Sequence, residues 1–118
     1  MLPIILDVSS LKVAVIGNGL QAVKRLDMLR DADVSEIDIF SPDPGNEMKA
    51  AAGNMMKLRL PSVEDISSYA IIFIANLEAE EVEKLAGQAR EQGVLVNVED
   101  VKPLCDFHVP SIIRRGKL

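Results

Sequence analysis

The amino-acid sequence predicts an α/β fold, in which helices cover both faces of a parallel sheet. Short aliphatic runs alternate with longer amphipathic segments along the 118 residues, 48% of the residues are hydrophobic, and only 3% are aromatic. Strands that are buried on both faces favour such aliphatic sequences. Because a helix between two strands forms a crossover connection, consecutive strands are expected to lie parallel.

The strands are predicted where apolar residues run together and a polar or glycine-containing turn follows. They are expected at residues 12–16, 37–40, 56–60, 70–75 and 94–97. The alternation of Met, Lys, Leu, Arg and Leu over residues 56–60 indicates a half-exposed strand near an edge of the sheet. The apolar run at residues 2–6 is also strand-like in composition.

The helices are predicted from apolar residues that recur every three to four positions. This spacing indicates helices at residues 20–30 and 78–92, with a weaker one at 46–52. Residues 98–118 form an irregular C-terminal extension, with a candidate strand at 111–115. We therefore expect residues 1–118 to form a single domain, because this length suits one hydrophobic core.

Charge and composition exclude several classes of protein. The formal net charge of −5 argues against a nucleic-acid partner, which requires a basic surface. The single cysteine, Cys105, provides neither a disulfide framework nor repeated ligand spacing for a metal, and we read it as a packing residue. No apolar stretch approaches the roughly 20 residues that span a bilayer. We expect a cytoplasmic protein that binds neither membrane nor nucleic acid.

A glycine-containing loop connects the first central strand to the first helix. Gly17 permits a tight turn, Gly19 lets the backbone approach a pyrophosphate, and small Ala22 lets helix and strand pack closely. This arrangement predicts a Rossmann-type domain that binds a dinucleotide at the N-terminus of the helix. The expected phosphate-binding residues are Gly17, Asn18, Gly19, Leu20, Gln21 and Ala22. The alternative is a turn that needs glycine only for its geometry.

Dinucleotide-binding domains usually place an acidic residue at the end of the second strand, where it binds a ribose hydroxyl. Here Ser41 lies at the tip of the predicted strand, and Asp43 is the first acidic residue after it. We assign both to the cofactor site, which favours NAD over NADP, although Asp43 can equally be an ordinary turn residue. Asp38 lies inside the strand and is expected to face solvent.

The C-terminal third of the chain carries a longer motif. It begins NVED at residues 97–100 and ends FHVPSIIRRGKL at residues 107–118. This segment resembles the N-V-x-D…C-D-F…P-(S/A)-I-(I/V)-R-R-G-x-L motif of the precorrin-2 dehydrogenases that form the N-terminal part of siroheme synthases. The opening LPIILD is similar too, and the resemblance covers essentially the whole chain in order.

The resemblance implies NAD-dependent oxidation of precorrin-2 to sirohydrochlorin, in some members joined to ferrous-iron insertion. The aspartate that the family associates with catalysis falls on Asp100. Asp100 also follows the last central strand, at the edge where open α/β sheets bind ligands, so its carboxylate could exchange protons with the macrocycle. The alternative is a carboxylate that caps a turn before Pro103.

Further binding residues are expected on both sides of Asp100. Asn76 follows the central strand at residues 70–75 and is a candidate ligand near the nicotinamide. The basic cluster formed by Arg114, Arg115 and Lys117 suits the carboxylates of precorrin-2, although a solvated tail fits equally well. The lone histidine, His108, is read as structural.

The chain also departs from the family it resembles. The family usually reads Gly-Gly-Gly where this chain has Gly17, Asn18 and Gly19, and it carries an Asn where this chain has Val82. The family's C-terminal dimerisation region is lacking from these 118 residues, although the resemblance implies a homodimer. The alternative function is a catalytically inactive Rossmann module that senses a nucleotide or binds a partner.

Overall fold

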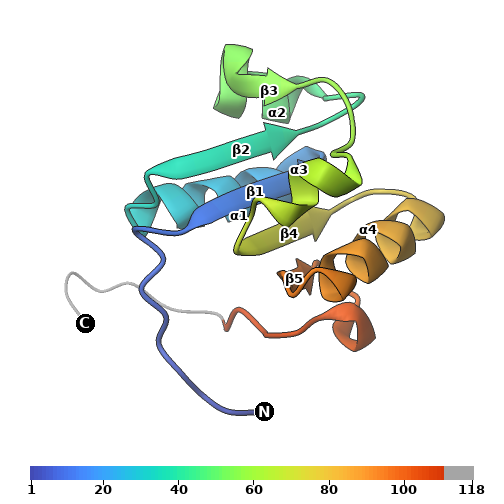
Figure 1. Cartoon of the computed structure of the whole chain (residues 1–118). Coiled ribbons are helices and arrows are strands. Elements are labelled where there is room, and N and C mark those ends of the chain that lie inside the picture. Colours follow the sequence, from blue (N-terminus) through green and yellow to red (C-terminus); the bar gives the residue numbers. More distant parts are fainter. Residues whose placement is uncertain (111–118) are drawn as a thin grey trace.

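Helices and strands alternate along the chain in the computed structural model, which describes residues 1–110 (Figure 1). The strands are β1 (Lys12–Gly17), β2 (Glu36–Phe40), β3 (Met56–Lys57), β4 (Ile71–Ala75) and β5 (Leu95–Val98). The helices are α1 (Gly19–Asp31), α2 (Asn46–Ala52), α3 (Val63–Ser67) and α4 (Ala79–Glu91). Short 3-10 turns cover Gly53–Met55 and Lys102–Leu104.

The five strands form one sheet in the order β3-β2-β1-β4-β5, and every pair of neighbours is parallel. In the central pair, Gly17 at the end of β1 lies opposite Ala75 at the end of β4. The chain continues from β1 to β2 on one side and returns to β4 on the other. The carboxyl ends of β1 and β4 therefore flank the topological switch point, where open α/β sheets bind ligands.

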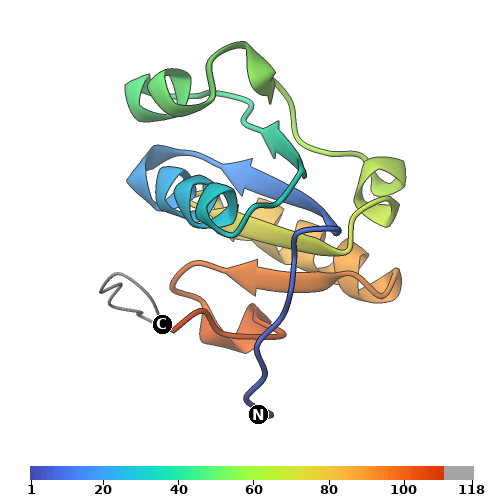
Figure 2. The ribbon, with the colours of Figure 1, turned by 90° about the vertical axis from the view of Figure 1, so that its left-hand side faces the viewer.

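Two hydrophobic clusters cover the two faces of the sheet. Helices α1 and α2 pack on one face, and α3 and α4 pack on the other (Figures 1 and 2). The side chains of β1 alternate accordingly, because Val13 and Val15 join the first cluster while Ala14 and Ile16 join the second. Every residue of this strand except Lys12 is buried, which explains its continuous apolar sequence.

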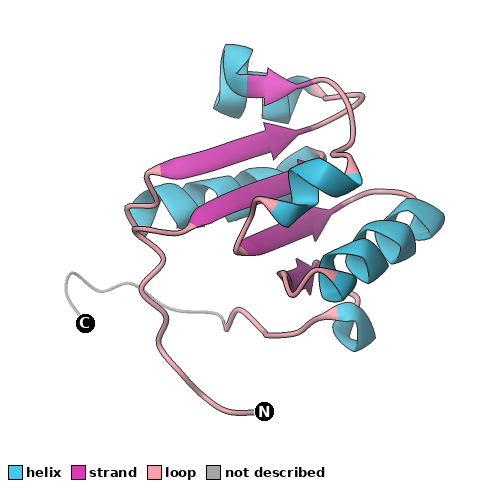
Figure 3. Ribbon diagram, in the orientation of Figure 1, coloured by secondary structure: helices cyan, strands magenta, loops and turns pink. Residues whose placement is uncertain are grey.

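The predicted fold class is confirmed, and the boundaries differ in three places. Residues 2–6 form no strand, so that expectation is wrong; the run extends away from the sheet, and Ile5 is fully exposed (Figure 3). Strand β3 ends at Lys57, earlier than predicted, and helix α3 was not predicted. The candidate strand at 111–115 lies outside the described residues. No helix within residues 1–110 is long and apolar enough to cross a membrane.

Candidate functional site

Gly17 is required by the close approach of two strands. Its φ of +139° is unfavourable for other residues, and a Cβ at this position would lie 1.8 Å from the carbonyl oxygen of Ala75. The same carbonyl accepts a hydrogen bond of 3.1 Å from the backbone N–H of Asn18. The glycine predicted to permit a tight turn therefore also holds β1 against β4, where the phosphate loop (residues 17–22) begins.

Gly19 opens helix α1 in a left-handed backbone conformation, with the side chains of Asn76 and Gln21 close beside it. It has a φ of +75°, and an added Cβ would lie 3.0 Å from the side-chain nitrogen of Asn76 and 3.3 Å from the side-chain oxygen of Gln21. Ala22, one turn later, is completely buried against the sheet. The burial of Ala22 matches the close packing predicted for the small residue of the motif, and the approach of a pyrophosphate at Gly19 stays a prediction.

The N-terminus of α1 has the character of an anion-binding site. Within the described residues no side chain caps this helix, and its first turn carries no acidic residue. The backbone N–H groups of Gly19, Leu20 and Gln21 have no partner inside the helix, because the first N–H groups of any α-helix lack one. With the helix dipole behind them, these donors can bind an anionic group such as a pyrophosphate.

The loop that follows β2, residues 41–45, lies beside the phosphate loop and is called the β2–α2 loop below. Ser41 is fully buried, and its hydroxyl has no hydrogen-bond partner in the part of the chain that the structure describes. Asp43 is exposed. The side chain of Asn18 donates to the carbonyl of Asp43 at 2.8 Å and accepts from the backbone N–H of Gly45 at 2.9 Å.

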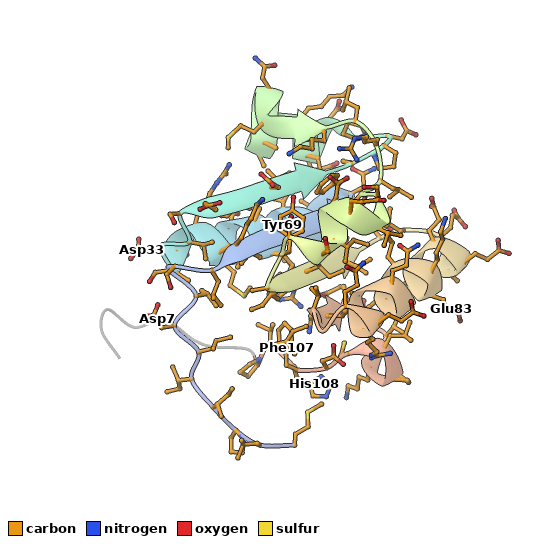
Figure 4. All side chains as sticks on the ribbon, viewed as in Figure 1. Asp7, Asp33, Tyr69, Glu83, Phe107 and His108 are labelled. Atoms are coloured by element: carbon orange, nitrogen blue, oxygen red, sulfur yellow. The ribbon has the colours of Figure 1, made fainter. Side chains whose placement is uncertain are left out.

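Asp38 faces solvent only in part, because its side chain is 32% exposed and has partners on neighbouring elements. It is half-buried and accepts a hydrogen bond of 2.5 Å from the hydroxyl of Tyr69, and it lies 3.6 Å from the ammonium of Lys57. Tyr69 packs on the face of the sheet that carries α3 and α4 (Figure 4). Burial and this hydrogen bond to Asp38 raise the pKa of Tyr69 above its usual value. Asp38 thus has two structural partners, Tyr69 and Lys57.

Asp100 lies on a tight turn that follows β5. The N–H of Val101 donates to the carbonyl of Val98 at 3.2 Å, and Asp100 adopts a φ of +64° between them. Its side chain is exposed. The neighbouring Glu99 forms an ion pair with Arg25 of α1, with side chains 25% and 19% exposed. This contact connects the Asp100 turn (residues 98–101) to the helix that begins at the phosphate loop.

Three residues named from the sequence line one pocket. Gln21, Asn76 and Asp100 come from α1, the end of β4 and the Asp100 turn, and they border a hollow of about 210 Å³. Asn76 and Asp100 both have left-handed backbone conformations, at φ +57° and +64°. Such conformations in residues other than glycine concentrate at functional sites. The other lining residues are Ile74, Leu77, Val82, Val98, Glu99 and Val101.

Sequence reasoning missed the Arg25–Glu99 ion pair and the contacts of the Asn18 side chain. Their partners lie 74 and 25–27 positions away along the chain, so no local pattern reveals them. Cys105 is half-buried and its sulfur lies 3.2 Å from the backbone nitrogen of Val98, in agreement with a packing role.

Two other expectations concern the end of the chain and metal binding. His108 is exposed and lies next to Phe107 near β5 (Figure 4). The basic cluster of Arg114, Arg115 and Lys117 lies outside the described residues. No group of three residues that could hold a metal ion occurs among residues 1–110.

Comparisons with known proteins agree with the fold. A family model described as "Putative NAD(P)-binding" matches residues 4–111. Siroheme synthases from Nitrosococcus oceani and Methylococcus capsulatus are each 32% identical over 98% of this chain, which spans about a quarter of their length. The solved structure of SirC, a precorrin-2 dehydrogenase, shares the fold with a TM-score of 0.74 at 22% identity, covering all of this chain and 58% of that one. The chain therefore belongs to the NAD(P)-binding family that this model describes.

Proposed function

We propose that this chain is the NAD-binding part of a precorrin-2 dehydrogenase in siroheme biosynthesis. One observation carries the proposal: the uncapped N-terminus of α1 and the Asp100 turn meet at the same pocket, where Gln21 and Asp100 are both lining residues. A cofactor bound at the phosphate loop would thus lie next to a carboxylate that can take a proton. The similarity to siroheme synthases and to SirC supports this combination of cofactor and substrate.

The chain's own residues would bind the cofactor through their backbone. The free N–H groups of Gly19, Leu20 and Gln21 would bind the pyrophosphate, with Asn18, Gly17 and Ala22 shaping the loop. Asp43, which is exposed, would bind the adenosine ribose, and the completely buried Ser41 would support the loop that carries it. Asn76, whose side chain lies close to Gly19, would contact the nicotinamide side of the cofactor. When bound, NAD supplies the acceptor for the hydride that precorrin-2 loses.

Asp100 would handle the proton that accompanies this hydride. Oxidation of precorrin-2 to sirohydrochlorin removes a hydride and a proton, and an exposed carboxylate at the pocket can accept the proton as a general base. Arg114, Arg115 and Lys117 would bind the carboxylates of the tetrapyrrole by charge-assisted hydrogen bonds. A homodimer, a cytoplasmic location and iron insertion at the same aspartate belong to the same proposal.

The cofactor part of the proposal is tested by calorimetry with NAD. The change Gly19→Val places a side chain where the pyrophosphate approaches, and we expect NAD affinity to fall by about tenfold or more. The matched control is Gly93→Val, because Gly93 has a similar φ of +73° but no described heavy atom within 4 Å of an added Cβ. Equal NAD affinity in the two variants, or no binding by the unmodified chain, would contradict the site.

The catalytic part is tested by NADH formation from precorrin-2, followed by absorbance. We expect Asp100→Asn to reduce turnover by about 10²–10⁴-fold and to leave NAD affinity unchanged, because it removes the proton acceptor and little else. Asp33→Asn is the control, since Asp33 is also exposed and has a φ of +60°. The assay uses this chain and a form extended by the segment that follows the matching region in the Nitrosococcus oceani relative. No turnover by either form, or full turnover by both Asp100→Asn variants, refutes the proposal.

A further inference from the structure

We infer that Asn18 positions the β2–α2 loop so that the site selects NAD over NADP. The inference rests on the proposed dinucleotide site, and it adds a role in cofactor specificity that the Rossmann-type fold alone does not assign to Asn18. It assigns Asn18 to positioning: its side chain acts on the adenosine end of the site through the loop and does not itself touch the cofactor.

The geometry shows a side chain that joins two loops. Its amide nitrogen donates to the carbonyl of Asp43 at 2.8 Å, and its amide oxygen accepts from the N–H of Gly45 at 2.9 Å. Its backbone N–H also donates to the carbonyl of Ala75. One residue therefore connects the ends of β1 and β4 to the backbone of the β2–α2 loop, and both ends of its amide are used.

Asn18 occupies the N-cap position of α1 but does not cap that helix. Asparagine is among the preferred N-cap residues because its side-chain oxygen ordinarily accepts from an N–H of the first turn. Here no side-chain cap bond forms within the described residues, because this oxygen accepts from Gly45 instead. The helix donors are thereby left available for phosphate, while the side chain stabilises the neighbouring loop.

The loop that Asn18 holds carries negative charge. Asp43 is the one charged residue of this loop, and α2 carries Glu47 in its first turn and Lys49 in its last turn. A carboxylate oxygen of Glu47 and the amide oxygen of Asn18 lie 3.3 and 3.8 Å from the same point, where a Cβ of Gly45 would be. A ribose hydroxyl can donate a hydrogen bond to such a carboxylate, whereas the 2′-phosphate of NADP would meet like charge.

The side-chain hydrogen bonds of Asn18 can be removed without disturbing its backbone. The backbone of Asn18 is extended, at φ −156°, so alanine or glycine can adopt it without strain. Asn18→Ala and Asn18→Gly therefore remove the two side-chain hydrogen bonds without forcing the backbone of the phosphate loop to move.

The inference is tested by the binding of four ligands, which are NADH, NADPH, NMNH and inorganic phosphate. NMNH lacks the adenosine half of the dinucleotide, and inorganic phosphate is a probe of the helix N-terminus. We expect both Asn18 variants to bind NADH about tenfold more weakly, and to bind NADPH, NMNH and phosphate as the unmodified chain does. The preference for NADH over NADPH then falls by the same factor. Equal losses for NADH and NADPH, or no loss for either, would overturn the specificity role.

Hydrogen exchange supplies a readout that needs no ligand. In the unmodified chain the N–H of Gly45 is bonded to Asn18, so its exchange should accelerate at least tenfold in both variants, while β1 amides keep their protection. Unchanged exchange at Gly45 would show that the loop is held by other contacts, and would refute the inference. If the unmodified chain binds neither NADH nor NADPH, the proposed function itself fails, whatever the exchange at Gly45 shows.

Discussion

The two halves of the carboxyl edge of the sheet are built differently. On the β1–β2 side, Gly17 packs directly on the backbone of Ala75, and Asn18 ties the phosphate loop to the β2–α2 loop. On the β4–β5 side, Asp100 sits exposed on a turn that is held by a backbone hydrogen bond and the Arg25–Glu99 ion pair. The β1–β2 side is therefore organised within the described residues, and the side that carries Asp100 is more open.

The size of the pocket supports this contrast. Pockets for small molecules commonly measure about 300–1,000 Å³, and a tetrapyrrole needs a large one. The hollow beside Asp100 measures about 210 Å³, which cannot enclose such a substrate. A tetrapyrrole at Asp100 must contact residues beyond this lining, and the basic cluster of Arg114, Arg115 and Lys117 is our candidate for part of that contact.

The strongest test of the organised half is Gly17→Ala. The new Cβ would lie 1.8 Å from the carbonyl oxygen of Ala75, so the backbone of β1 or β4 must move. We expect the free energy of unfolding to fall by more than about 3 kcal/mol, measured by urea denaturation. Gly87→Ala is the control, because its added Cβ in α4 would meet no described atom within 4 Å apart from its chain neighbours and its own helix backbone, and alanine favours helix.

Near-normal stability of Gly17→Ala would contradict the close approach of β1 and β4. The two halves of the edge would then be equally deformable. A large loss in Gly87→Ala would show instead that the chain tolerates no added methyl group, and the comparison with Gly17 would carry no information about the phosphate loop.

Most of the fold could be predicted from the sequence because strands that are buried on both faces have continuous aliphatic sequences, which are easy to recognise. Helix α3 was missed because its five residues are too few for apolar periodicity, although the reciprocal hydrogen bonds of Ser62 and Asp65 form a capping box whose spacing is visible in the sequence. The prediction of a strand at residues 2–6 was wrong because an apolar run forms a strand only where a neighbouring strand pairs with it. The partial burial of Asp38 was not predicted because its partner, Tyr69, is 31 residues away along the chain.

The candidate site divides in the same way. The phosphate loop was predicted from a local pattern, the spacing of Gly17, Gly19 and Ala22 between a strand and a helix. The contacts that constrain the two glycines involve Ala75 and Asn76, which are distant along the chain. Asp100 was named by resemblance, and its pocket with Gln21 and Asn76 emerged only when three separate segments were brought together. The roles of Asn18, Arg25 and Glu99 depend on side-chain contacts between distant segments, which composition and spacing cannot predict.

A smaller effect is expected where the two halves of the edge are coupled. Arg25 of α1 and Glu99 of the Asp100 turn form an ion pair with partly buried side chains. We expect a double-mutant cycle of Arg25→Met and Glu99→Gln to give a coupling free energy of about 1 kcal/mol in urea denaturation. The loss in Arg25→Met should be moderated, because the Nε atom of Arg25 is buried without a partner within residues 1–110.

The same cycle distinguishes positioning from stability. If the ion pair orients the Asp100 turn, both single variants should lower kcat for precorrin-2 several-fold and leave NAD affinity unchanged, since the phosphate loop does not depend on Glu99. The control is Arg90→Met, because Arg90 forms a similar ion pair with Asp106, at 3.1 Å, and neither residue lines the Asp100 pocket. Arg90→Met should cost comparable stability and leave kcat unchanged. An equal fall of kcat in Arg90→Met would mean that turnover follows overall stability, and that Arg25 and Glu99 do not orient Asp100.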